Sequence, residues 1–418
     1  LRVALQGLFA EDHRPVGRRG SFRLVVDRLY EAKEGEVSSG FEFSGEVLRR
    51  ALRNIYSKNF RPMTDIEINL FNEICDRINE AARKGLDESG TVDPDDDFRT
   101  AILRNNEVFA AFKVHRMQND MARLLLDSNG NLKPFEQWRK EVMPIASHQV
   151  GQWLRTEYNT AVLRAHQAAD WQQFEREKDV LPNLRWMPST SVNPGKDHMV
   201  FWGTVRPIDD PFWNEHRPGD RWNCKCDLSS TDDPVTEIPD FTRKDNPHPG
   251  LDNNPGKDGK LFSDTHPYIA NAYPGAKKAV EKLMAQLEKS KAIKIRRKEI
   301  QREAASLKNE SFRNQHFEYP IHITGRGIKE WLNQPHKFYE AKNEMLLSIK
   351  EILKEAKYWG YGPDRHDLTV KAHLFEVELQ GEKSWIVVRE FSSNKVEVHS
   401  ISDSENIKDI ITKKPDSL

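Results

Sequence analysis

Cysteine, net charge and long apolar runs are all scarce in this 418-residue chain. Three cysteines, a low and odd number, exclude a scaffold stapled by disulfides and indicate a reducing compartment. The 64 Lys and Arg residues nearly balance the 65 Asp and Glu residues, so no overall field attracts nucleic acid or a membrane surface. No apolar run could span a bilayer and no signal peptide begins the chain, so we expect no membrane partner.

Length and composition instead predict several modest hydrophobic cores. Charged residues make up 31% of the chain and the mean hydropathy is −0.76, which is polar for a single compact enzyme. At about 100–200 residues per domain, the length predicts two to four domains. Because the chain begins at Leu1 rather than Met, we expect a fragment or a processed product.

Periodicity divides the chain into four parts. Helical patterns fill residues 1–105 and continue through 106–240, whose second half turns to short extended pieces rich in Pro, Trp and Gly. Residues 241–310 combine a polar loop with a charged helical spacer, and residues 311–418 contain both helical and strand patterns. We therefore predict a multidomain α+β protein, with mainly helical N-terminal and central regions and with C-terminal helices packed on a small antiparallel sheet.

The ends of two helices can be predicted from the sequence. In MTDIEINLFNEICDRINEAARKG, Thr64 stands at the N-cap and Glu67 at the capping-box position, and Cys75 falls inside as a small buried hydrophobe. In PHKFYEAKNEMLLSIKEILKEAKYWG, one amphipathic helix is expected to start at Pro335 and to end at Gly360.

The stretch DRWNCKCDL places Cys224 and Cys226 one residue apart, on the same face of an extended segment. A disulfide between them would close a small, strained ring, whereas two thiolates at this spacing can share a metal. His198 is the best third ligand, and Asp197 or His216 could complete a tetrahedron, which predicts a structural zinc site. The alternative is a pair of reduced, half-buried thiols beside a locally hydrogen-bonded histidine.

Five motifs around this cysteine pair carry a family resemblance. In order, they are GQWLRTEYNTAV, RWMPS, DHMVFWGTVRPIDDPFW, RPGDRWNCKCDL and NNPGKDGKLF followed by HPY. Together they resemble the minor head protein family typified by the F protein of phage Mu, over roughly residues 106–268. The resemblance implies a head morphogenesis domain at 106–240, with portal and capsid proteins as partners. It also implies a location in the virion, and in the host bacterial cytoplasm during assembly.

Three β-runs near the C-terminus, AHLFEVELQG, KSWIVVREFS and KVEVHSIS, predict an antiparallel meander behind helices. Strict alternation of side chains assigns one face of this meander to the helices. The residues on that face are Phe375, Val377, Ile386, Val388, Val396 and Val398.

The opposite face, expected to be open, collects Glu376 or Glu378 with Arg389 and His399. These residue types suit RNA cleavage without a metal. The carboxylate would take the 2′-OH proton, arginine would hold the phosphate, and histidine would protonate the leaving 5′-oxygen. The alternative is a cross-strand salt bridge beside a solvent-exposed histidine.

Five further residues lie near the strand–glycine turn–helix pattern YPIHITGRGIKEW and just after it. We expect His322, Thr324, Arg326, His336 and Lys337 to form one cluster that contacts substrate phosphate. A simple helix-capping role is the alternative.

The order of a helix and then a meander, with HITGRGIKEWLNQPH, VREF and VHSISDS, resembles the barnase–EndoU–colicin–RelE-like ribonuclease fold over about residues 317–405. Domains of that class occur at the C-termini of some phage head proteins, which implies an RNA-cleaving effector. Three interpretations stay open: an active virion nuclease, a purely structural virion protein with an inactive C-terminal domain, and a polymorphic toxin. In the last, the head-protein region serves for delivery and an immunity protein is a partner.

Overall fold

The computed structural model describes residues 22–23, 26–27, 30, 43–89, 94–191, 196–365 and 367–413. The chain forms two compact units, residues 1–285 and 286–418, that contain both helices and sheets, which confirms the multidomain α+β class. The finer division into four parts stays a prediction. In the described part of the chain, no helix combines the length and the apolar character needed to cross a membrane.

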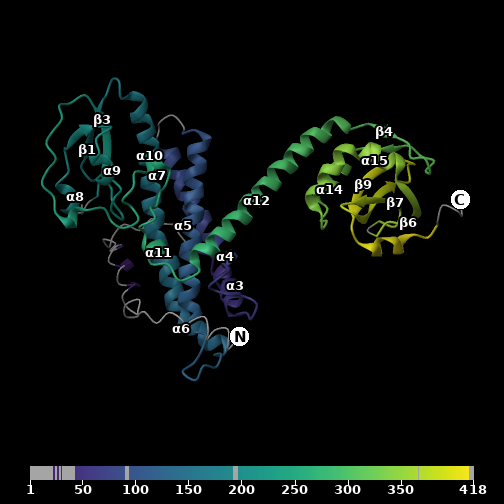
Figure 1. The fold of residues 1–418 in the computed structure, drawn as a ribbon, viewed down its shortest axis with the longest axis horizontal. Coiled ribbons are helices and arrows are strands. Elements are labelled where there is room, and N and C mark those ends of the chain that lie inside the picture. Colours follow the sequence, from purple (N-terminus) through teal and green to yellow (C-terminus); the bar gives the residue numbers. More distant parts are fainter. Residues whose placement is uncertain are drawn as a thin grey trace. The chain divides into compact units, whose positions relative to one another are not determined.

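Long helices form the framework of the first unit (Figure 1). They are α3 (Gly45–Tyr56), α4 (Ile68–Glu88), α5 (Asp96–Ala122), α6 (Phe135–His148) and α7 (Leu154–Glu177), with a π turn at Gln149–Trp153. Helix α4 packs against both α5 and α7. Its approach to α7 requires a glycine, because a Cβ at Gly85 would clash with the Val162 carbonyl.

The start of α4 differs from the prediction. The helix begins at Ile68, and Glu67 rather than Thr64 is its N-cap. The Glu67 carboxylate is buried and accepts a hydrogen bond from the Leu70 N–H at 2.7 Å. One of the free N–H groups in the first turn of the helix is therefore bonded to a glutamate side chain, which is longer than the predicted threonine cap. Cys75 is buried inside the helix, as expected.

A charged pair is buried between α5 and α7. Lys113 and Glu157 form an ion pair at 2.7 Å, and both side chains are fully buried. The hydroxyls of Tyr30 and Tyr268 donate to the same carboxylate at 3.0 and 2.9 Å. Burial raises the pKa of Glu157, and Lys113 partly offsets this effect. The pair belongs to the core of the first unit.

Another buried cation, Arg164 of α7, is hydrogen-bonded to Gly219 and to the polar loop that opens residues 241–310. Its guanidinium donates to the carbonyls of Gly219, Leu251, Asn253 and Leu261 at 2.7, 3.2, 3.1 and 2.7 Å. The loop carries the short helices α10 (Pro255–Asp258) and α11 (Pro267–Ala270). A segment with few apolar residues is thus fixed by hydrogen bonds from one side chain.

The Trp-rich segment folds into a three-stranded antiparallel sheet of order β2-β1-β3. Its strands are β1 (Asn183–Met187), β2 (Val205–Pro207) and β3 (Asp227–Thr231), and the short helices α8 (Lys196–Met199) and α9 (Phe212–Glu215) lie between them in sequence. Aromatic residues dominate the core beside this sheet: Trp171, Trp186, Phe201, Phe212 and Trp213 are buried together with Cys226.

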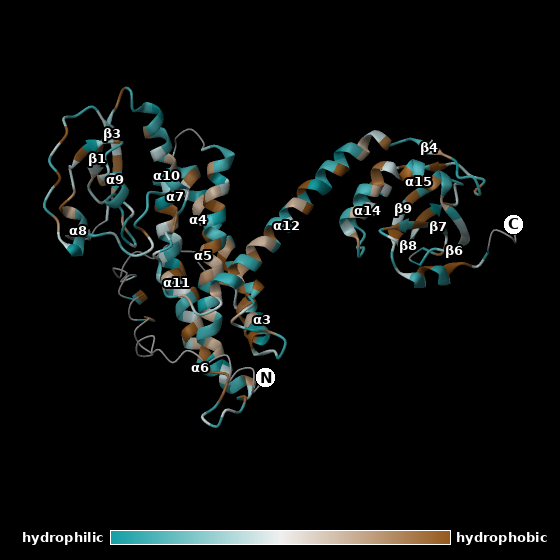
Figure 2. Cartoon of the chain, in the orientation of Figure 1, coloured by the Kyte–Doolittle hydropathy of each residue, from teal (hydrophilic) through white to brown (hydrophobic). Residues whose placement is uncertain are grey.

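The charged helix α12 (Ala276–Glu303) begins in the first unit and ends in the second, and hydrophilic residues predominate along it (Figure 2). The second unit continues with β4 (Ser311–Phe312), β5 (Ile321–His322), α13 (Gly325–Asn333), α14 (Tyr339–Met345) and α15 (Ile349–Glu355). The strands β6 (Lys357–Pro363), β7 (Lys371–Leu379), β8 (Glu382–Glu390) and β9 (Val396–Ser402) follow.

These strands form one six-stranded sheet of order β4-β5-β9-β8-β7-β6, in which β5 and β9 run parallel and the other pairs antiparallel. The single helix predicted from Pro335 to Gly360 is wrong at both ends: α14, a 3₁₀ turn at Leu346–Ser348 and α15 follow one another over residues 339–355, and the last residues belong to β6. Gly360, with a φ of 120°, lies at a register shift of β6 beside the Lys413 carbonyl, where a Cβ would clash.

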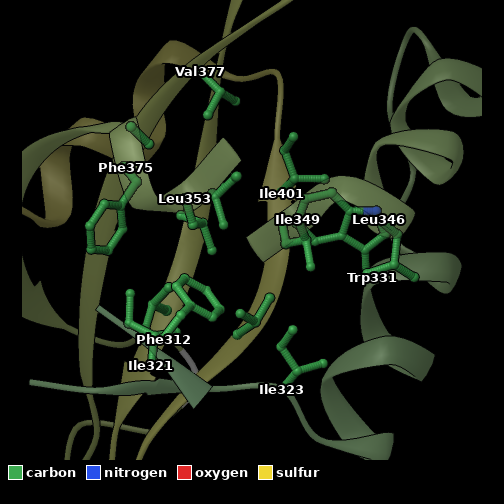
Figure 3. Close-up of a cluster of buried hydrophobic side chains, with 14 of the residues drawn as sticks. Phe312, Ile321, Ile323, Trp331, Leu346, Ile349, Leu353, Phe375, Val377 and Ile401 are labelled. Carbon is green, nitrogen blue, oxygen red and sulfur yellow. The ribbon is translucent and has the colours of Figure 1, made fainter. Parts of the chain in front are cut away.

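The predicted alternation is confirmed on the helix-covered face. All six residues assigned to it are buried in one cluster with Trp331, Leu346, Ile349 and Leu353 from the helical side (Figure 3). Each strand residue on this face therefore packs against helices or neighbouring strands.

The opposite face is less open than predicted. Leu374 and Val387 form a second buried cluster there, with Ile407, Ile410 and Ile411 of the C-terminal segment packed against it. Ile407 and Ile410 belong to a 3₁₀ helix, Glu405–Ile410. Only the part of this face that the C-terminal segment leaves uncovered can hold a site.

Candidate functional site

A polar pocket lies in the second unit where β8 and β9 meet the start of α13. Its wall combines Arg326 and Gly327 of α13 with Arg389, Phe391, Glu397, Val398 and His399. An adjoining depression shares Arg326, Phe391 and Glu397 and adds Thr324, Ser392, Ser393 and Lys395. Three of the predicted site residues, Arg326, Arg389 and His399, thus meet in one pocket, and Thr324 borders it.

A β-bulge sets the position of His399. Val388 pairs with Val398 and Val387 pairs with Ser400, so the register shifts at His399, which has no residue directly opposite on β8. A bulge re-aims the side chain of its extra residue, here toward Arg389 and Arg326. Burial, together with Arg389, lowers the pKa of His399 to about 4. The imidazole is therefore neutral at pH 7.

Neither predicted carboxylate reaches this pocket. Arg389 pairs with Ala372, and Glu376 lies four residues farther along β7, about 13 Å at about 3.3 Å per residue. Glu376 instead accepts a hydrogen bond from Trp359 Nε1 at 2.8 Å and forms an ion pair with Lys383 at 2.9 Å. The expectation that it shares a site with Arg389 is wrong, because alternation fixes the face of a residue but not its place along the strand.

The same correction applies to Glu378, which is exposed and pairs with Lys383 near the far end of β7. The carboxylate that does line the pocket is Glu397, in register with Arg389 on the neighbouring strand. Glu397 accepts a hydrogen bond from the Thr324 hydroxyl at 3.1 Å and forms an ion pair with Lys395.

A second carboxylate, Asp364, orients the arginine of the pocket. Arg389 donates to its two oxygens at 2.8 and 3.0 Å, and both side chains are largely buried. Such a paired geometry fixes the plane of the guanidinium. Arg326 lies on the exposed first turn of α13, so the pocket contains one anchored and one solvent-exposed guanidinium.

The predicted cluster of five phosphate-contacting residues is split. Thr324 is the N-cap of α13, as the capping alternative required, and it also borders the pocket. His322 is half-buried on β5, where its backbone lies in register with that of Glu397 on the neighbouring strand β9. His336 and Lys337 lie elsewhere, at the end of β8 remote from Arg389.

There, His336 is buried at 3.2 Å from the Ser384 hydroxyl, and Lys337 forms an ion pair with Glu382. Both partners stand at the first residues of β8, whereas Arg389 stands near its last. These two residues are separated from the pocket by most of a strand, so the prediction of a single cluster is wrong for them.

The three predicted metal ligands do come together in the first unit. His198 Nδ1 lies 3.2 Å from Cys224 Sγ and 3.6 Å from Cys226 Sγ, and the three ligand atoms lie within 4.8 Å of one another. The Cys224 thiol and His198 hold the pKa of Cys226 at about 4 against the effect of burial. The trio could hold a metal that prefers sulfur and nitrogen.

The two candidates for a fourth ligand differ in outcome. The side chain of Asp197 lies outside the described residues. His216 is not in the group, because its ring packs against Phe201 and Phe241 at centroid distances of 5.1 and 4.5 Å. A residue that the sequence did not single out, Asp220, lies instead beside the histidine, with Oδ1 2.6 Å from His198 Nε2.

Comparison with known families gives two matches. Residues 129–229 match the family described as Phage Mu protein F like protein, and residues 291–398 match the Large polyvalent protein-associated domain 3. No curated protein and no solved structure matches the chain. The first match confirms the resemblance over a shorter stretch than expected, and neither match indicates a nuclease.

Proposed function

We propose that this chain, whose residues 129–229 form a Phage Mu protein F-like domain, is a minor head protein that acts in phage head morphogenesis near the portal. The family match carries this proposal. The matched residues run from the approach to α6 into β3 and include α7, from which Glu157 and Arg164 are buried in the unit. Portal and capsid proteins are the proposed partners, in the virion and in the host bacterial cytoplasm during assembly.

This role predicts that purified particles contain the chain. Mass spectrometry should detect it at a small copy number relative to the major capsid protein, because a protein placed near the portal serves only one vertex. A particle preparation that lacks the portal protein supplies the control and should contain less of the chain. Absence of the chain from both complete particles and isolated portal complexes would contradict the proposal.

A second function is favoured by the pocket of the second unit. Its two guanidinium groups, one imidazole and several hydroxyls suit an RNA phosphodiester, and no metal-binding carboxylate pair is needed for them to act. We therefore propose that residues 286–418 cleave RNA without a metal. This assignment keeps Arg389 and His399, places Glu397 beside them in place of Glu376 or Glu378, and gives His399 the role of base instead of the predicted role of acid.

The neutral state of His399 determines its role in this reaction. Its nitrogen takes the proton from the 2′-OH, and the 2′-oxygen bonds to phosphorus as the bond from phosphorus to the 5′-oxygen breaks. The leaving oxygen takes a proton from solvent, and the products are a 2′,3′-cyclic phosphate and a 5′-hydroxyl end. Arg389 and Arg326 hold the phosphoryl oxygens, while Glu397 is positioned by Thr324 and Lys395.

Rescue by a neighbouring immunity gene distinguishes a polymorphic toxin from a virion effector. Expression of the chain in a bacterial cytoplasm should arrest growth in both cases. In the first case, co-expression of a neighbouring immunity gene should restore growth, whereas a portal gene next to this gene favours the virion role. Expression without any effect on growth would favour a structural virion protein with an inactive second unit.

A further inference from the structure

We propose that His198, Cys224 and Cys226 form a structural zinc site in the first unit. The three side chains come from two separate places, helix α8 and the extended segment directly before β3. They converge although 26 residues separate His198 from Cys224. Two thiolates and an imidazole are the donors that zinc prefers over magnesium or calcium.

The distances fit one ion at the centre of the group. In a tetrahedral site with bonds of about 2.0–2.3 Å, neighbouring nitrogen and sulfur ligands lie about 3.5 Å apart. The observed separations of His198 Nδ1 from the sulfur atoms of Cys224 and Cys226 are 3.2 and 3.6 Å. With all three atoms within 4.8 Å of one another, the group is close to the size that one tetrahedral ion requires.

Hydrogen bonding alone can join the three groups only through Cys226, with the Cys224 thiol and the His198 ring both bonded to its sulfur. Both sulfur atoms point at the same nitrogen, and one imidazole nitrogen carries either a single proton or a single lone pair. It can therefore make one good hydrogen bond with these two thiols, not two. An ion in place of that proton satisfies all three groups at once.

The surroundings also match a metal-bound histidine. Asp220, which is fully buried, lies with Oδ1 2.6 Å from His198 Nε2 and so orients the ring with Nδ1 toward the sulfur atoms. A carboxylate behind a metal-ligating histidine fixes the ring and increases its basicity. Arg221 donates to the same Asp220 oxygen at 2.9 Å, which holds the carboxylate in place.

Hydrogen bonds also fix the position of the segment that carries the two cysteines. The Cys226 N–H donates to Cys224 Sγ at 3.3 Å, a contact that stabilises a thiolate. Gln167 of α7 donates to the Cys226 carbonyl at 3.0 Å, and Asn223 adopts a left-handed φ of 59° just before the first cysteine. The half-buried position of Cys224 leaves access for the ion and for a water molecule as the fourth ligand.

Metal analysis of the full chain, purified under reducing conditions, tests the site. Wild type should carry about one zinc per chain, and cobalt in its place should give the thiolate-to-cobalt absorption of a tetrahedral sulfur site. Cys224→Ser and Cys226→Ser should lose the metal and this absorption. Cys75→Ser, which removes a cysteine buried in α4, should retain both.

A milder variant covers the case in which the cysteine variants fail to fold. Asp220→Asn keeps all three ligands and should weaken zinc affinity about 10–100-fold by the loss of the supporting carboxylate. Wild-type protein that binds neither zinc nor cobalt would overturn the proposal. Equal metal content in wild type and in folded Cys224→Ser or Cys226→Ser would overturn it as well.

Discussion

His399→Ala is expected to slow RNA cleavage by the full chain about 10²–10⁴-fold, the usual contribution of a general base. The neighbouring Arg326 and Arg389 cannot accept a proton, and the carboxylate of the pocket, Glu397, is already engaged by the Thr324 hydroxyl and the Lys395 ammonium. Since its pKa is about 4, the wild-type rate should stay level between about pH 6 and 8 and fall as His399 becomes protonated in acid. Initial rates on a fluorogenic RNA measure both effects.

The best matched control for this variant is Glu378→Gln. Glu378 was predicted to act with His399, but it is exposed and lies outside the pocket, so its loss should leave the rate unchanged. Arg326→Ala should reduce cleavage by the removal of one phosphate contact. Cleavage should continue in EDTA. Equal rates for wild type and His399→Ala would exclude this pocket, and failure to cleave any RNA would leave the second unit as a binding or structural domain.

The sequence predicted which residues share a face of the C-terminal sheet but not which residues share a site. Alternation follows from the pleat of each strand, so Phe375 and Val388 could be assigned to the buried face without any knowledge of pairing. Register depends on turns and bulges that no periodicity records. The bulge at His399 and the four-residue separation along β7 therefore decided that Glu397, not Glu376, lines the pocket.

Strand β6 shows a different reason for a wrong prediction. In the sequence, its residues come directly after a helical pattern, with no turn signal between them, and a glycine such as Gly360 commonly ends a helix. The aromatic residues Tyr358, Trp359 and Tyr361 were the signal for a strand, because large aromatic side chains favour a pleated, half-buried surface. Pairing with β7 outweighed the helical pattern.

In the first unit, the site residues that could be predicted from the sequence were those of a residue type that is scarce in the chain. Cys224, Cys226 and His198 stood out because thiols are few, and the structure does bring them together. Asp220 did not, although it stands four residues before the first cysteine. Lys113 and Glu157 escaped notice for a related reason, since a charged residue in an amphipathic helix is normally a solvated one.

The second large effect is expected from that buried pair. Glu157→Gln should lower the free energy of unfolding of the first unit by about 3–5 kcal/mol, because it leaves the Lys113 ammonium buried without a counter-charge. Burial already lowers the pKa of Lys113, and Glu157 opposes that effect. Urea unfolding of the full chain, followed by circular dichroism, measures the change. The transition of the second unit serves as an internal control and should not move.

The double variant Lys113→Met with Glu157→Gln distinguishes a lost attraction from an unpaired charge. It removes both charges and keeps an acceptor for the hydroxyls of Tyr30 and Tyr268, so it should recover most of the stability that Glu157→Gln loses. Recovery would show that the pair is costly to break rather than strongly stabilising in itself, as is common for buried ion pairs. A double variant as unstable as the single one would contradict this account, and would mean that the ion pair itself supplies the stability of the α5–α7 contact.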